Sequence, residues 1–256
     1  MRASARLATP RQALPTREAA FLLILAASAW AATIALSRGM AGMPGTMGLG
    51  LAPFVAIWTL MMSAMMLPSV TPTASLYARS VVTSRPARIA GLVAGYLGVW
   101  AAAGIPAFGV ARMAGWLAGV HPAAAHILAV TVFATCGVYQ LSSLKNRCLA
   151  HCRSPIALLL HYGSYRGRFR DVRAGAHHGG YCLGCCWSLM AVLIVLGTMN
   201  VVAMAGLAAV VLAEKVAKRG RFIGRLAGFA AIGLAAATIW LPWLAPGLHV
   251  ANQMAS

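Results

Sequence analysis

The feature that most constrains this chain is a series of long apolar runs separated by short segments rich in arginine, glycine and proline. The runs cover residues 19–36, 51–70, 89–110, 123–144, 182–213 and 226–245. About 20 apolar residues suffice to cross a bilayer as a helix, and backbone groups in lipid must bond to one another. The sequence therefore predicts an all-α fold, a polytopic transmembrane bundle of six or seven membrane helices.

Composition and motifs narrow the class further. Only 9% of residues are charged, whereas soluble domains carry about 25%. We expect one membrane domain over residues 19–245, preceded by a basic tail at 1–18 and followed by a short tail at 246–256. The lipid bilayer is the first expected partner. No catalytic triad, P-loop or dinucleotide-binding motif is recognisable, so an enzyme is not the favoured class.

The apolar run at 182–213 can be interpreted in two ways. As one helix its 32 residues would be about 48 Å long, against a hydrocarbon core of about 30 Å. Gly197-Thr198-Met199-Asn200 interrupts the run and could reverse the chain. A hairpin there gives seven helices and places nearly all Lys and Arg residues on one face, which predicts that this face and the N-terminus are cytoplasmic. A single tilted helix, giving six spans, remains the alternative.

The net charge of +18 fits this arrangement. Basic loops of membrane proteins set their orientation and contact anionic lipids, and no nucleic-acid-binding module is recognisable. We therefore expect no nucleic-acid partner. The three acidic residues are Glu18, Asp171 and Glu214, and Glu214 is expected to pair with Lys218 one helical turn later.

The residues with distinctive chemistry are sulfur and imidazole side chains gathered around a predicted basic Cys/His loop at 145–181. Thiolates and thioethers select soft metals such as Cu(I), whereas calcium and magnesium need oxygen ligands. Nearby Lys and Arg are expected to lower the pKa of the thiols. The predicted metal ligands are Cys148, Cys152, His178, Cys182, Cys185, Cys186, Met62 and Met66.

Topology predicts that these ligands converge. The runs 89–110 and 123–144 form a hairpin, so the segments 71–88 and 145–181 lie at the same membrane face. The run 51–70 ends at that face, which brings its Met61–Met66 stretch toward the thiols. The cofactor is therefore expected to be a soft transition metal ion, copper or zinc.

Three motifs resemble, in order, a bacterial family of predicted metal-binding integral membrane proteins, a domain family of unknown function. They span roughly residues 50–215 and read Met61-Met62-Ser63-Ala64-Met65-Met66-Leu67-Pro68, then Tyr139-Gln140-x4-Lys145-x2-Cys148-x3-Cys152-Arg153-x-Pro155, then His178-Gly179-x2-Cys182-Leu183-Gly184-Cys185-Cys186-Trp187-x-Leu189-Met190, followed by Gly197-x-Met199-Asn200. The resemblance implies an inner-membrane location and a metal site. It supplies no activity.

The favoured hypothesis is therefore an integral inner-membrane protein that binds a soft metal for handling or delivery, with Cu(I) preferred over zinc. A metal-donor or metal-acceptor protein would be its partner. The first alternative is a membrane thiol–disulfide oxidoreductase that uses Cys182 and Cys185, because a C-x-x-C pair can exchange disulfides. A transporter or an assembly subunit are the further alternatives.

Overall fold

The structure is a computed structural model that describes residues 17–40, 43–81, 84–154 and 160–248, and all regular structure in these ranges is helical. Most of the predicted tails at 1–18 and 246–256 lies outside the described residues. Six described helices are long and apolar enough to cross a membrane: α1 (Arg17–Met40), α2 (Leu51–Ser80), α3 (Arg85–Val120), α4 (Pro122–Leu141), α7 (Arg170–Leu196) and α9 (Gly220–Trp240). The predicted all-α class is confirmed.

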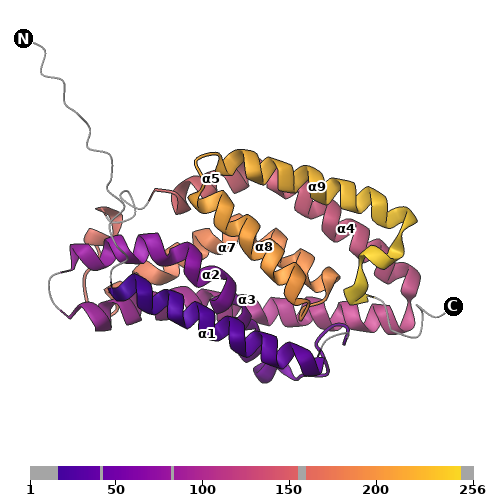
Figure 1. Ribbon diagram of the computed structural model, residues 1–256, viewed down its shortest axis with the longest axis horizontal. Coiled ribbons are helices and arrows are strands. Elements are labelled where there is room, and N and C mark those ends of the chain that lie inside the picture. Colours follow the sequence, from indigo (N-terminus) through magenta and orange to yellow (C-terminus); the bar gives the residue numbers. More distant parts are fainter. Residues whose placement is uncertain (1–16, 41–42, 82–83, 155–159, 249–256) are drawn as a thin grey trace, which may run out of the picture.

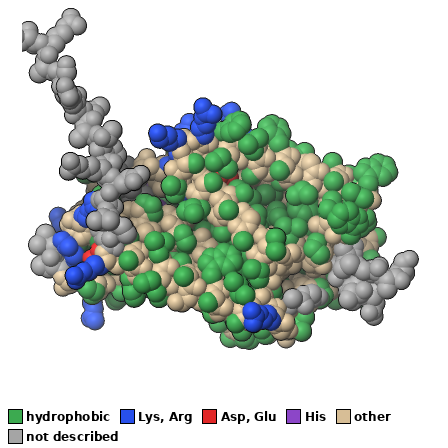
Figure 2. Space-filling view, viewed as in Figure 1, with side chains coloured by type: hydrophobic (Ala, Val, Ile, Leu, Met, Phe, Trp, Pro, Cys, Tyr) green, Lys and Arg blue, Asp and Glu red, His purple; other side chains and the backbone are tan. Residues whose placement is uncertain are grey.

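The shorter elements are α5 (Ser143–Cys152), α8 (Val201–Val216) and two 3-10 turns, η1 (Pro242–Leu244) and η2 (Pro246–Leu248), and residues 160–163 are also helical. The long helices pack in pairs, α1 on α2, α3 on α7 and α4 on α9. In Figure 1, α4 and α9 form one edge of the bundle and α8 crosses its middle. Figure 2 shows an apolar surface over most of this view, with Lys and Arg gathered mainly toward one end.

The helical structure is interrupted at residues 197–200, the segment at which the sequence predicted a reversal of the chain. Helix α7 ends at Leu196 and α8 begins at Val201. Gly197 has φ +97°, a conformation that side-chain-bearing residues rarely adopt, and Asn200 caps α8 by accepting a hydrogen bond from the Ala203 N–H at 3.1 Å. A single helix over 182–213 is therefore wrong, and the hairpin is the observed form.

Three segments expected as loops are mostly helical. Helix α2 continues through Pro68 and Pro72 to Ser80, and α3 continues to Val120. Prolines are tolerated within apolar helices when the surrounding structure satisfies the backbone, and both α2 prolines lie inside the helix. The predicted loop at 145–181 contains most of α5 and nearly half of α7, so His178 lies on a helix.

Glycines let α3 and α7 approach closely enough to form the centre of the bundle. A Cβ at Gly95 would overlap the Val172 carbonyl, and one at Gly175 would overlap the Leu92 carbonyl. Small residues permit this kind of backbone contact between helices. The close approach places Tyr96 of α3 beside the cysteines of α7.

Candidate metal centre

Helix α5 lies against α7 and brings its two cysteines to the α7 cysteine motif. Gly184 makes this contact possible, because a Cβ there would stand only 3.1 Å from the Cys148 sulfur. On the α4 side, the Tyr139 hydroxyl donates a hydrogen bond to the Gly184 carbonyl. Two helices thus fix the middle of the Cys182–Cys186 segment.

The thiols of α7 are buried and turned toward their own helix. Cys182, Cys185 and Cys186 are at most 1% exposed. The Cys185 and Cys186 thiols both donate to the Cys182 carbonyl, with sulfur–oxygen distances of 3.2 and 2.8 Å. Cys152 of α5 is also buried and belongs to the same core cluster as these cysteines. The structure therefore brings together four of the predicted cysteines, from two helices.

The Cys182 sulfur has two polar neighbours that the sequence analysis did not select. The Tyr96 hydroxyl lies 2.9 Å from it, and the Lys215 ammonium donates to it at 2.9 Å. Lys215 also donates to the Ser69 hydroxyl of α2 at 3.1 Å. No carboxylate in the described part of the chain forms an ion pair with Lys215. In the sequence this lysine looks like one more charge in a basic loop, so no local signal identified it.

His178 and the two methionines are also buried near this site. His178 is 4% exposed, its ring centre lies 5.8 Å from that of Tyr96, and its Nδ1 has no hydrogen-bond partner within the described residues. Met62 and Met66 are fully buried and belong to the same apolar core as Cys152 and Cys182. The Met66 carbonyl accepts a hydrogen bond from Ser69, which places this part of α2 one turn from the Lys215 contact.

The donors suit a soft metal in kind, but they are not preorganised. Among the described residues, no three His, Cys, Asp or Glu side chains are already arranged to hold one ion. The hydrogen bonds explain this, because Cys185 and Cys186 point back at a carbonyl and Cys182 faces Tyr96 and Lys215. Binding would require these thiols to rotate and release those contacts.

The expected lowering of thiol pKa values is wrong for the two cysteines of α5. Burial raises the pKa of Cys148 above its ordinary value, and the nearby Cys185 raises it further. The hydrogen bond with Cys185 and then burial raise the pKa of Cys152 well above its ordinary value. Lys215 lowers the pKa of Cys152, but by less than the other contributions raise it.

A closed ion pair lies next to the thiol site. The Lys145 ammonium donates to the Glu214 carboxylate at 2.6 Å, and both side chains are 1% exposed. The Gln140 amide donates to the same carboxylate oxygen at 3.0 Å. The expected pairing of Glu214 with Lys218 is therefore wrong, because tertiary contact between α5 and α8 supplies a buried partner.

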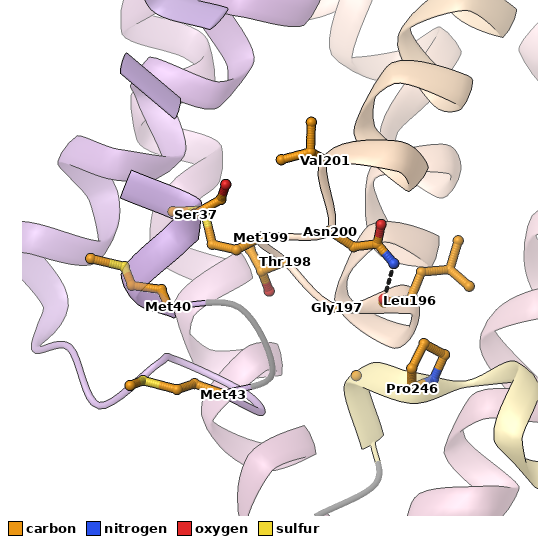
Figure 3. A pocket seen from close by; sticks show the side chains of 11 residues that line it. Ser37, Met40, Met43, Leu196, Gly197, Thr198, Met199, Asn200, Val201 and Pro246 are labelled. Carbon is orange, nitrogen blue, oxygen red and sulfur yellow. Dashed lines mark hydrogen bonds between the residues drawn. The ribbon is translucent and has the colours of Figure 1, made fainter. Parts of the chain in front are cut away.

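The opposite end of the bundle holds a cavity of about 320 Å³ between the end of α1, the α7–α8 turn and η2. Met40, Met43 and Met199 line it, and in Figure 3 the Met199 side chain points toward Ser37 of α1. The Asn200 amide donates to the Leu196 carbonyl at 3.2 Å (Figure 3). Asn200 therefore stabilises the turn between α7 and α8.

Comparison with known proteins gives one result. The profile of a family described as "Copper chaperone" matches residues 55–238, which include all eight predicted ligands. No curated protein and no solved structure matches the chain. The family description agrees with the metal-related resemblance found in the sequence and specifies copper.

Proposed function

The chain belongs to the copper chaperone family, and on that premise we propose that it is an integral membrane protein that holds Cu(I) as cargo in its buried thiol site. Cys152, Cys182 and Cys185 are the primary ligands. Cys148, Cys186 and His178 would complete or exchange the ligand set, and Met62 and Met66 would supply thioethers on the α2 side. Thiolate and thioether donors favour Cu(I) over harder ions.

The observation that carries this proposal is the unpaired positive charge at the thiols. Two thiolates that bind one Cu(I) form a complex with a net charge of −1, and burying a net charge is costly unless an opposite charge compensates it. The Lys215 ammonium already lies 2.9 Å from the Cys182 sulfur and has no carboxylate partner among the described residues. Lys215 would therefore act as the counter-ion of the loaded site.

The six long apolar helices support a membrane location. The segments around Arg17, Arg85, Arg170 and Arg219 begin helices at the end of the bundle that carries α5. Basic residues concentrate on the cytoplasmic side of bacterial inner-membrane proteins, so we place this end in the cytoplasm. A soluble copper donor or acceptor protein would dock there.

The test is anaerobic Cu(I) titration of the detergent-purified chain against the chromophoric chelator bicinchoninate. The Cys182→Ser/Cys185→Ser variant should lose tight binding, whereas Cys136→Ser should keep it, because Cys136 is a buried cysteine of α4 outside the proposed ligand set. Equal copper binding by all three proteins would refute the proposal. A Cys182–Cys185 disulfide that cycles in cells without copper binding would instead favour the oxidoreductase alternative.

A further inference from the structure

Three histidines outside the thiol ligand set come together at its outer side. His151 of α5, His161 and His177 of α7 form what we term the imidazole cluster. The ring centres of His161 and His177 are 4.9 Å apart, and those of His151 and His177 are 6.1 Å apart. His151 also stacks on Tyr181 at 3.9 Å. The three rings come from three separate segments, so tertiary packing alone creates the cluster.

The spacing of the rings matches that of imidazoles that share a metal ion. A metal–nitrogen bond of about 2.0–2.1 Å puts each ring centre about 3.2 Å from the ion, so two rings at a tetrahedral angle have centres about 5.2 Å apart and never more than about 6.4 Å. The His161–His177 separation is near the tetrahedral value, and the His151–His177 separation requires a wide angle at the ion. The rings are not yet aimed at one point, since the described residues contain no preformed group of three ligands. His151 and His161 are exposed and can change rotamer.

The ring nitrogens are open to a ligand. The Nδ1 atom of His177 is buried and has no hydrogen-bond partner within the described residues. Buried polar atoms normally have a partner, so an unpaired ring nitrogen indicates a ligand or a water molecule. His161 Nε2 has only an exposed contact with the Tyr165 hydroxyl at 3.2 Å, which an ion could replace at little cost.

Residues at the imidazole cluster are sequence neighbours of the proposed ligands of the thiol site. His151 precedes Cys152, His177 precedes His178, and Tyr181 precedes Cys182. Successive residues of a helix point in directions about 100° apart, so one member of each pair can face outward while the other faces the core. The exposure follows this pattern, because His151 is exposed and Cys152 is buried, while His177 is half-buried and His178 is buried.

We propose that the imidazole cluster is a surface Cu(I) site through which copper reaches the buried thiols, an inference that rests on the proposed function. Imidazole binds copper but is a less soft ligand than thiolate. Transfer would exchange imidazole nitrogen for thiolate sulfur without changing the oxidation state of copper. Each thiol that becomes a ligand releases its proton to solvent, as metal binding to cysteine requires.

The experiment uses the full chain in detergent and follows anaerobic Cu(I) transfer from its bicinchoninate complex. The His151→Gln/His161→Gln variant changes only exposed side chains, so folding should be retained and can be checked by circular dichroism. The matched control is His121→Gln, an exposed histidine at the other end of the bundle. We expect the double variant to keep the final affinity of the thiol site but to load copper about tenfold more slowly, a loss typical of groups that assist a metal site.

A second measurement separates this inference from the proposed function. The Cys152→Ser/Cys182→Ser/Cys185→Ser variant should retain one weak Cu(I) equivalent, which disappears when His151 and His161 are also replaced. Loading at the wild-type rate by the double histidine variant would overturn the inference while leaving the thiol site intact. Absence of tight, cysteine-dependent binding in the wild type would overturn the proposed function instead.

Discussion

Glu214 and Lys215 are neighbours on α8, but their side chains join two different polar clusters. Glu214 completes a closed set in which its carboxylate accepts from Lys145 at 2.6 Å and from Gln140 at 3.0 Å. Lys215 contacts only neutral groups in the described structure, the Cys182 thiol and the Ser69 hydroxyl. The first cluster balances its own charge, whereas the second has a positive charge in excess.

This difference in charge balance distinguishes the Glu214 cluster, which has a structural role, from the Lys215 cluster, which is proposed to support copper binding. Breaking a buried ion pair is strongly destabilising, because removing one partner leaves an uncompensated charge. The half-buried Lys215 ammonium has no carboxylate partner within the described residues, and a negative charge at the buried Cys182 sulfur would attract it strongly. The Cu(I)–thiolate complex would bring that charge, so the second cluster suits a site that is alternately loaded and emptied.

The largest expected effect is a loss of stability when the buried Lys145–Glu214 ion pair is broken. Glu214→Gln leaves the Lys145 ammonium buried beside a neutral amide and should destabilise the chain by about 3–5 kcal/mol. Thermal unfolding in detergent, followed by circular dichroism, measures the loss. The double variant Lys145→Met/Glu214→Leu removes both charges and should recover most of the stability. A double variant less stable than Glu214→Gln would contradict this view of the pair.

The second effect, smaller in free energy, should appear in copper binding. Lys215→Met removes the proposed counter-ion and should weaken Cu(I) binding about tenfold, as expected for a group that supports metal ligands. Lys215→Arg keeps the charge and should bind nearly as the wild type does. Lys218→Met changes an exposed lysine two residues after the end of α8 and is the control. Equal affinities for the Met and Arg variants at position 215 would remove the charge argument.

The smallest expected effect is on the ionisation of Cys148. Burial and Cys185 hold the pKa of Cys148 above its ordinary value, so this thiol is protonated at neutral pH and becomes a thiolate only as the pH rises through that higher pKa. Iodoacetamide reacts with thiolates. Peptide mass spectrometry of labelled protein should therefore give Cys148 a labelling midpoint above that of glutathione. A midpoint below it would mean that nearby charges outweigh burial at this position.

The sequence by itself determined the class of the fold and the kind of chemistry. Apolar runs of bilayer length leave a helical bundle as the one arrangement that satisfies the backbone in lipid. The break after Leu196 was also readable, because Gly197 can adopt a positive φ and Asn200 can cap a helix. The soft character of the cysteine and methionine side chains favoured copper over zinc without deciding between them, and the family match specifies copper.

Only the tertiary structure decided which polar groups meet. Helix ends depended on burial, since the apolar contacts of α2 and α3 extend both helices beyond their hydropathic runs and α7 begins well before Cys182. The partners of Cys182 lie 86 and 33 residues away along the chain, at Tyr96 and Lys215. The imidazole cluster likewise depends on how α5 and α7 pack. Sequence patterns report local periodicity, whereas charge pairing and ligand geometry depend on contacts between distant segments, which no local pattern encodes.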